Sequence, residues 1–160
     1  MDNTPVALNP LEAGYLRVLQ LGAVVPASLL LAGAVAAGWF AARQVGALGW
    51  AATLPIVAIA AWSGLFAPRR RWAAWGWALA DGELHVARGV WVQVHTVVPL
   101  ARVQHIDVAQ GPIERANQVA RLIVHTAGTE HATVTLPGIT RATAEELRDT
   151  IRGQIRSDPW

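Results

Sequence analysis

The chain lacks two residue types that carry much of enzyme chemistry. Among its 160 residues there is no cysteine, and all 13 basic residues are arginine because lysine is also absent. Without cysteine the chain has no disulfides, thiolate zinc sites, iron–sulfur clusters or cysteine nucleophiles. Without lysine it has neither a Schiff base nor a P-loop lysine. The sequence therefore excludes several classes of enzyme before any motif is considered.

Charged residues are also scarce. They make up 15% of the chain, whereas hydrophobic residues make up 53%; an ordinary soluble domain is roughly one quarter charged. This composition predicts a membrane protein. At this length, with part of the chain inside lipid, there is room for one small extramembrane domain.

The few charges are distributed unevenly along the chain. Residues 1–71 contain five arginines and two carboxylates, a net charge of +3, whereas residues 72–160 contain eight arginines and nine carboxylates, a net charge of −1. A nucleic-acid-binding protein concentrates basic residues on its folded domain. Because the excess positive charge lies in the membrane part instead, nucleic-acid binding is not expected.

Two apolar stretches are long enough to cross a bilayer. Residues 18–42 and residues 44–68 each form 25 consecutive positions without a charge, separated by Arg43, and about 20 apolar residues suffice to span the hydrocarbon core. The first stretch is too long for a signal peptide, whose apolar region has roughly 7–15 residues. The spacing predicts a two-helix transmembrane hairpin over residues 18–68 with a very short connection.

The arginines that flank these stretches predict the orientation. Arg17 precedes the first stretch and Arg69, Arg70 and Arg71 follow the second, while the connection holds Arg43 alone. Cytoplasmic flanks accumulate basic residues. We therefore expect a multi-pass protein with both termini in the cytoplasm.

The segment that follows the second stretch is a candidate lipid contact. The candidate headgroup-binding residues are Arg69, Arg70, Arg71, Trp72 and Trp75. The simpler interpretation is a stop-transfer anchor beside anionic lipid, and the more specific one is a site that recognises a lipid headgroup.

From residue 72 onward, continuous apolarity gives way to alternation, which is typical of half-buried strands. Asp81-Gly82 is a strong signal for a β-hairpin, Ile113 to Val119 is expected to form a loop or short helix, and Pro137-Gly138 is expected to end the sheet. Strands are predicted over residues 75–80, 84–88, 90–98, 103–110, 122–126 and 132–136.

The last segment has a helical pattern. Thr143 and Glu146 fit a capping box, and an apolar stripe follows at intervals of three and four residues. The stripe comprises Ala144, Leu147, Ile151 and Ile155. Short antiparallel strands followed by one amphipathic helix predict a small curved sheet or an open barrel closed at one end.

Four blocks within the strand region carry a family resemblance. They are residues 98–108 (VPLARVQHIDV), 110–115 (QGPIER), 126–128 (TAG) and 136–139 (LPGI). In this order and spacing they resemble the bacterial pleckstrin-homology-like (PH-like) membrane proteins of the YdbS type. In one departure, this chain has Asn117-Gln118 where the family has a leucine-glycine pair, so Asn is expected to take the positive φ angle of that turn.

The resemblance has several implications. It implies a location in the bacterial inner membrane, a cytoplasmic segment at residues 1–17 and a cytoplasmic PH-like domain at residues 72–160. That domain would be a mainly-β barrel closed by a C-terminal α-helix. The family has no established catalytic activity, and its members often occur beside a larger membrane protein that carries repeated PH-like domains, which makes such a protein the expected partner, with self-association as another possibility.

No catalytic, cofactor-binding or metal-binding residues are predicted. The serines lie in the apolar stretches and the tail, so no nucleophile elbow exists. The five histidines have no helix-type ligand spacing, although His125 and His131 flank one turn. Glu145 and Glu146 begin a helix, where they complement its dipole.

The leading hypothesis is a non-enzymatic membrane protein whose domain is an interaction or assembly module. Trp91, Gln93 and His95 alternate with valines that we expect to be buried, so they are the candidate interface; otherwise Trp91 is buried in the barrel or rests on the bilayer. The alternative function is a sensor of anionic lipid through the arginines and tryptophans of residues 69–75. Phosphoinositide binding at the first hairpin is disfavoured because Asp81 and Glu83 would repel phosphate.

Overall fold

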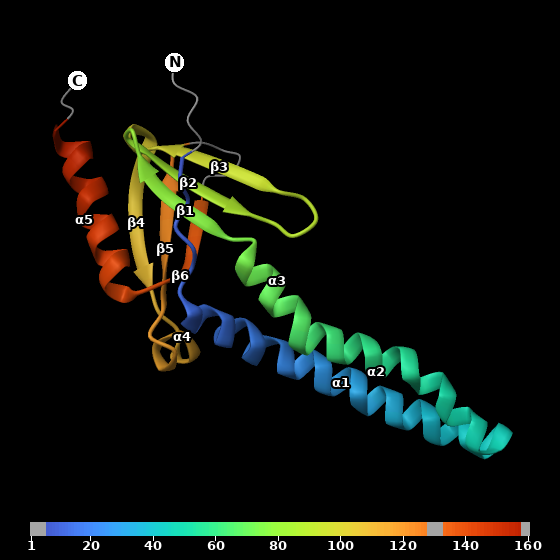
Figure 1. The fold of residues 1–160 in the computed structure, drawn as a ribbon. Helices are drawn as coiled ribbons and strands as arrows, with labels where there is room; N and C mark the ends of the chain where they lie inside the picture. Colours follow the sequence, from blue (N-terminus) through green and yellow to red (C-terminus); the bar gives the residue numbers. More distant parts are fainter. Residues whose placement is uncertain (1–5, 128–132, 158–160) are drawn as a thin grey trace. The chain divides into compact units, whose positions relative to one another are not determined.

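The computed structural model describes residues 6–127 and 133–157 and contains a long apolar N-terminal helix, a mainly-β region and a C-terminal helix (Figure 1). The chain divides into two compact units. One comprises residues 19–70, and the other combines residues 1–18 with residues 71–160. Both boundaries between the units fall inside helices.

The first helix, α1 (Ala13–Val45), is apolar on all sides. Its large side chains are mostly exposed, among them Leu29 and Phe40 with exposed fractions of 69% and 68%. Within the described residues, the helical stretch Ala13–Ala51 is the one that is long and apolar enough to cross a membrane. A helix that exposes apolar side chains on every side fits lipid as its solvent.

The second apolar stretch is helical but segmented. A 3-10 helix (Gly46–Thr53) is followed by α2 (Leu54–Ala61), a π-helical turn (Trp62–Phe66) and α3 (Ala67–Ala73). Pro55 lies in the first turn of α2, where a backbone N–H has no partner within the helix, so the ring is accommodated there.

Close packing in this unit depends on where its glycines lie. Gly46, with φ +70°, ends α1 and reverses the chain. A Cβ atom on Gly38 would lie 2.5 Å from the Trp50 ring and 2.7 Å from Thr53, whereas one on Gly33 would have no neighbour within 4 Å. The two glycines therefore have different roles: the absence of a side chain at Gly38 allows the close contact with Trp50 and Thr53, whereas Gly33 makes no such contact.

We expect Gly38→Ala to destabilise the helical unit by about 1–3 kcal/mol, because the added methyl group overpacks the contact with Trp50. The matched variant Gly33→Ala should be neutral or slightly stabilising. Thermal unfolding of the full chain in detergent, followed by circular dichroism, measures both. Equal midpoints for the two variants would contradict this packing.

The first sheet contains β1 (Gly76–Ala80), β2 (Glu83–Arg88) and β3 (Val94–Pro99) in the order β1-β2-β3. Asp81 and Gly82 both have positive φ angles, 52° and 74°. This is the geometry of a type I′ turn, whose twist matches that of the paired strands. The predicted β-hairpin at Asp81-Gly82 is confirmed.

The second sheet contains β4 (Val103–Ala109), β5 (Ala120–Thr126) and β6 (Thr133–Ile139) in the order β4-β5-β6, with the short helix α4 (Pro112–Ala116) between β4 and β5. A 3-10 turn (Leu100–Arg102) connects the two sheets. As predicted, Leu122 and Val124 are fully buried.

The prediction that Pro137-Gly138 ends the sheet is wrong, because β6 continues to Ile139. In the described part of the chain β6 is the outer strand of its sheet, where the missing N–H of Pro137 is tolerated. Gly138 has φ +70°, and a Cβ atom there would collide with the Tyr15 ring at 2.5 Å. Glycine thus serves close packing inside the strand rather than its termination.

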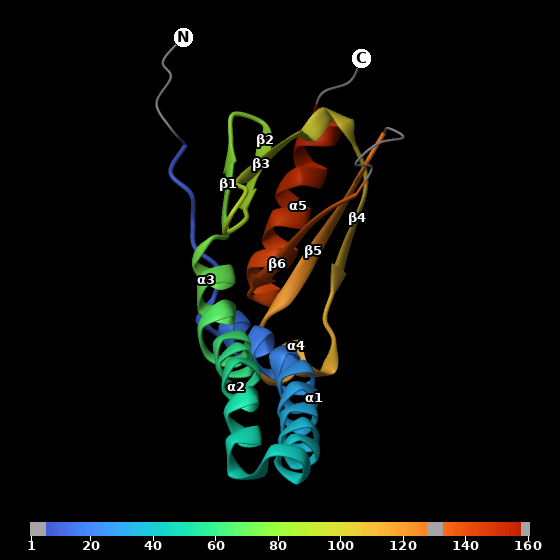
Figure 2. The same cartoon turned by 90° about the vertical axis from the view of Figure 1, so that its right-hand side faces the viewer.

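The last helix, α5 (Arg141–Ser157), packs against β4 and β5 (Figure 2). The capping box predicted at Thr143 is wrong. Thr140 caps the helix instead, because its Oγ1 accepts the Thr143 backbone N–H at 3.0 Å. The predicted apolar stripe is confirmed at Ala144, Leu147 and Ile151, while the side chain of Ile155 lies outside the described residues.

Both sheets and α5 share one hydrophobic core. It includes Leu84 and Val98 from the first sheet, Leu122 and Leu136 from the second, and Ile151 from α5. The remaining buried members comprise Leu11, Val86, Leu100, Val103, Ile106, Ala120, Val124, Ile139, Ala144 and Leu147.

One member of this core, Leu11, precedes the apolar stretches in the sequence and is only 3% exposed. Its neighbours are held by backbone hydrogen bonds. Asn9 pairs with Trp77 of β1 through bonds of 2.7 and 3.0 Å, and the Glu12 N–H donates to the Gly138 carbonyl of β6 at 2.8 Å. Residues 9–12 therefore bridge β1 and β6.

We expect Leu11→Ala to lower the free energy of unfolding of this unit by about 2–5 kcal/mol, because it leaves a cavity in the shared core. Leu8→Ala, at a position that is 39% exposed, should cost much less. Limited proteolysis of the full chain in detergent, monitored over a temperature series, compares the two. A Leu11 variant as resistant as the Leu8 variant would show that residues 9–12 are not part of the core.

Candidate functional site

A groove of about 710 Å³ opens at the end of the first sheet where β1 begins. It is lined by Leu8 and Pro10 and by residues 73–76 and 87–89. Gln93, Val94 and His95 complete the lining. The groove is named the β1 groove.

The structure separates the three predicted interface residues. The strand predicted over residues 90–98 begins only at Val94, so Trp91 and Gln93 lie in the loop between β2 and β3 while His95 lies in β3. Gln93 and His95 are exposed and line the β1 groove, whereas Trp91 does not line it.

The expectation that the alternating valines are buried is wrong for most of them. Val90, Val92 and Val94 are 37%, 73% and 42% exposed, and only Val98 reaches the core. The reason is that the chain turns away from the sheet at Gly89, whose φ angle is +111°. Residues 90–92 consequently form an exposed apolar tip, on which Trp91 is 89% exposed.

The five candidate headgroup residues have different surroundings. Arg69, Arg70 and Arg71 are exposed, and the Arg70 guanidinium lies 5.4 Å from the centre of the Trp62 ring, a cation–π distance. Trp72 donates its indole N–H to the Glu12 carbonyl at 3.0 Å. Trp72 and Trp75 are both partly buried and pack against the domain core.

Two histidines and one carboxylate meet on the exposed face of the second sheet. The Nε2 atoms of His105 and His125 lie 2.9 and 3.2 Å from the two carboxylate oxygens of Asp107, and Thr133 contacts His125 Nδ1 at 3.2 Å. His131 lies outside the described residues. Within those residues, no group of three or more His, Asp or Glu side chains is arranged to hold a metal ion.

His85 adds a buried polar group beside the β1 groove. It is 8% exposed, its ring lies 5.4 Å from that of His95, and its Nε2 lies 3.8 Å from the Glu83 carboxylate. In the described part of the chain, His85 Nδ1 has no hydrogen-bond partner. The His85 ring therefore lies next to a residue that lines the groove.

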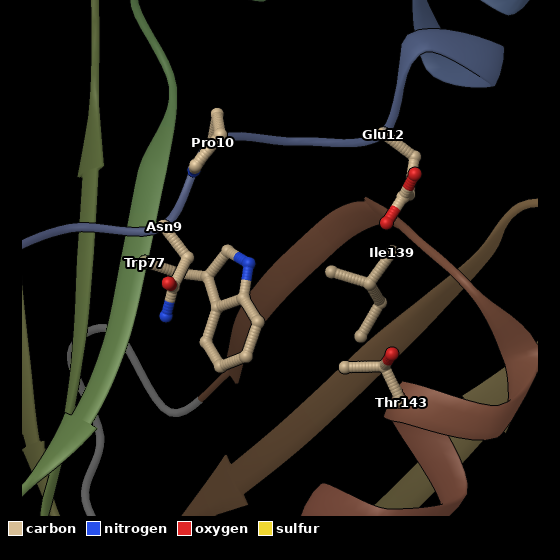
Figure 3. Close-up of a pocket in the computed structure, with 6 residues that line it drawn as sticks. All are labelled: Asn9, Pro10, Glu12, Trp77, Ile139 and Thr143. Carbon is tan, nitrogen blue, oxygen red and sulfur yellow. The ribbon is translucent and has the colours of Figure 1, made fainter.

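A second, smaller hollow of about 360 Å³ lies beside residues 9–12 (Figure 3). It is lined by Asn9, Pro10, Glu12, Trp77, Ile139 and Thr143, with Asn9 beside Trp77 and Glu12 near Ile139. Glu12 supplies one carboxylate, and the Thr143 hydroxyl is engaged with Thr140 Oγ1 at 2.8 Å. These groups do not form a nucleophile–base pair.

Glu114 is a buried carboxylate with a structural role. It is 7% exposed, accepts the Gly111 backbone N–H at 2.7 Å and pairs with Arg121 at 3.0 Å. The turn that follows lacks glycine, and the residue with positive φ is Gln118, at 59°, rather than Asn117 as expected. Asn117 instead donates its side-chain N–H to the Ile113 carbonyl at 2.9 Å.

Comparison with known proteins agrees with this architecture. A family model described as the bacterial PH domain matches residues 16–155. The chain belongs to the bacterial PH domain family. It is also 32% identical, over 84 residues, to a protein of Bacillus subtilis (strain 168) named UPF0699 transmembrane protein YdbS.

That match covers 52% of this chain and 51% of the relative, so it spans about half of the relative's length. No solved structure matches the chain. The predicted resemblance is confirmed: this is a YdbS-type bacterial membrane protein with a PH-like domain.

Proposed function

We propose that the chain is a non-enzymatic protein of the bacterial inner membrane whose PH-like domain, residues 72–160 together with the bridge at residues 9–12, is a cytoplasmic interaction module. In this proposal residues 18–42 and 44–68 form a two-helix transmembrane hairpin. The two sheets around their common core form the bent barrel, which α5 closes.

The strongest support for a hairpin comes from the bridge between β1 and β6. Leu11 and the hydrogen bonds of Asn9 and Glu12 hold the chain before the apolar stretches in the same folded unit as the chain after them. A folded domain lies on one side of a membrane. Residues 19–70 must then cross an even number of times, and two crossings match their length.

The arginine distribution supports a cytoplasmic location for that unit. Arg17 and Arg69–Arg71 flank the membrane segment on the side of the domain, and Arg43 alone lies at the opposite end. Both termini are then cytoplasmic. No other charged residue lies near the connection.

Single cysteines test this topology in a chain that has none of its own. Gln44→Cys should react with an impermeant maleimide in whole cells, whereas Gln104→Cys, on an exposed position of β4, should react only after permeabilisation. Thr129, in the predicted turn after β5, lies outside the described residues, so Gln104 is the better position. The reverse labelling pattern would rule out the orientation.

The interaction role rests on the β1 groove. It is built from three separate parts of the chain and presents the polar side chains of Gln93 and His95 beside apolar walls, and its lining residues include no pair of nucleophile and base. A concave apolar surface with a few polar groups is typical of recognition. The proposed partner is a neighbouring membrane protein with repeated PH-like domains, or a second copy of this chain.

The remaining side chains also favour a role without catalysis. Ser63 donates its hydroxyl to the Ala60 carbonyl at 2.9 Å inside the apolar helices, which leaves it no base. Asp107 is engaged by two histidines and Glu114 by Arg121 and Gly111. Each of these groups therefore has a partner within the chain.

Site-specific photocrosslinking in cells tests the groove. A benzophenone amino acid at Gln93 or at His95 should give adducts with a membrane protein that carries PH-like domains or with a second copy. The same residue at Gln104, which is exposed but outside the groove, should not. Ala87→Trp, which fills the groove from β2, should remove the adducts without lowering the thermal midpoint.

Adducts of equal yield at Gln93 and Gln104 would contradict the groove as the site of binding. So would adducts that persist in the Ala87→Trp variant. Mass spectrometry of the adduct distinguishes a second copy from a different membrane protein.

A second candidate role, sensing of anionic lipid, is favoured by the exposure of three consecutive arginines. Within the described residues, Arg69, Arg70 and Arg71 form no ion pair with a carboxylate. Their charges are free to attract anionic headgroups, at about 1 kcal/mol for each arginine near the surface. Trp72 and Trp75 contribute by packing this segment onto the domain.

A further inference from the structure

We propose that residues 90–92, the tip of the loop between β2 and β3, insert into the interface of the lipid bilayer and give the domain a second membrane contact besides its helical tether. This goes beyond the proposed function, which concerns the β1 groove. The occupant is the bilayer surface, recognised by an apolar tip rather than by a headgroup pocket.

The first observation is the exposure of the tip. Val90, Trp91 and Val92 are consecutive apolar residues with exposed fractions of 37%, 89% and 73%. Runs of exposed apolar side chains are unfavourable in water and mark a binding surface when they persist. Tryptophan in particular prefers the membrane–water interface, where its ring is in an apolar layer and its N–H remains hydrated.

The second observation is that the fold holds this loop in place. Arg88 and Val94 are paired across β2 and β3, so the loop contains only five residues. Gly89 has φ +111°, and a Cβ atom there would collide with the Val92 carbonyl. The turn is therefore compact and preformed, and insertion would require little ordering of the chain.

The third observation is the charge distribution of the first sheet. Asp81 and Glu83 lie at its hairpin end, while its other end carries Arg88 next to the tip, and no acidic residue occurs between Arg88 and Arg102. The two ends are separated by the length of β2, about 17–20 Å. Only the loop end can approach an anionic surface without repulsion.

The fourth observation is the position of this end in the chain. Gly76 begins β1 and pairs with Ala87, so the loop lies at the end of the sheet where the chain arrives from α3 (Figure 1). Seven residues lie between Pro68 and Gly76, so the distance between these two Cα atoms is at most about 29 Å for an extended chain. The tip is thus at the end of the sheet that is joined to the helices, whereas the acidic hairpin is at the opposite end.

Lipid quenching in reconstituted full-length protein tests the proposal. A cysteine at Val92 carries an environment-sensitive fluorophore, and an identical label at Ala101 serves as the control. Ala101 is exposed and lies at the hairpin end, where the Leu100 N–H donates to the Gly82 carbonyl at 3.0 Å. The vesicles contain phosphatidylcholine, alone or with phosphatidylglycerol, and lipids spin-labelled on their acyl chains.

The label at residue 92 should shift to the blue and be quenched by the spin-labelled lipid, while the label at residue 101 should show neither effect. Trp91→Ser in the Val92→Cys chain should reduce the quenching without changing the thermal midpoint, because Trp91 contributes little to the core. Stronger quenching in the presence of phosphatidylglycerol would add a contribution from Arg88 to the same contact.

Equal quenching at the two positions, or none at either, would overturn the proposal. A blue shift at residue 92 without lipid quenching would also overturn it, because the tip would then be buried against protein. These outcomes do not depend on the crosslinking at Gln93 and His95, so the failure of this proposal and the failure of the interaction module can be told apart.

Discussion

The bridge formed by residues 9–12 constrains the rest of the molecule. Three backbone hydrogen bonds and the buried Leu11 hold a segment from before the apolar helices between β1 and β6. Each bond by itself contributes only about 0.5–1.5 kcal/mol, but together with Leu11 they commit the chain on both sides of the membrane segment to one domain. A single crossing would leave Leu11 outside its core, so the packing of one leucine bears directly on membrane topology.

The two units bury and expose apolar surface in opposite ways. Residues 19–70 expose large side chains such as Leu29 and Leu54, which suits a lipid environment, whereas the PH-like unit buries Leu84, Leu122 and Leu136 in the core shared by its two sheets. The tryptophans follow the same division. Trp72, Trp75 and Trp77 pack against the domain core. Trp91, in contrast, is highly exposed. An exposed tryptophan beside two exposed valines makes this tip a candidate contact surface.

Patterns that depend on near neighbours could be predicted from the sequence. The Asp81-Gly82 turn is fixed by the two residues that form it, and the burial of Leu122 and Ile151 follows from strand and helix periodicity. Errors arose where a distant contact decides the outcome. Pro137-Gly138 stays in β6, where the distant Tyr15 packs on the glycine. The α5 cap is a different kind of error, because Thr140 and Thr143 are near neighbours and the sequence pattern did not distinguish between them. The β1 groove could not be foreseen, because Leu8, Trp75 and His95 are brought together only by the tertiary fold.

The two ends of the first sheet differ in charge, and this difference decides which end could contact lipid. A PH-like domain that bound phosphate at its first hairpin would need basic residues there, but Asp81 and Glu83 occupy that end. The basic and apolar residues, Arg88 and the tip at Trp91, occupy the other end, where the chain enters from α3. For a domain already tethered by helices, the tether sets a high local concentration at the membrane, so even a weak second contact with lipid is occupied and no tight headgroup pocket is needed. What the domain gains from a second contact is a fixed orientation. In the arrangement proposed above, an apolar tip would supply that orientation without selecting a particular lipid, and it would leave the neighbouring groove free for a protein.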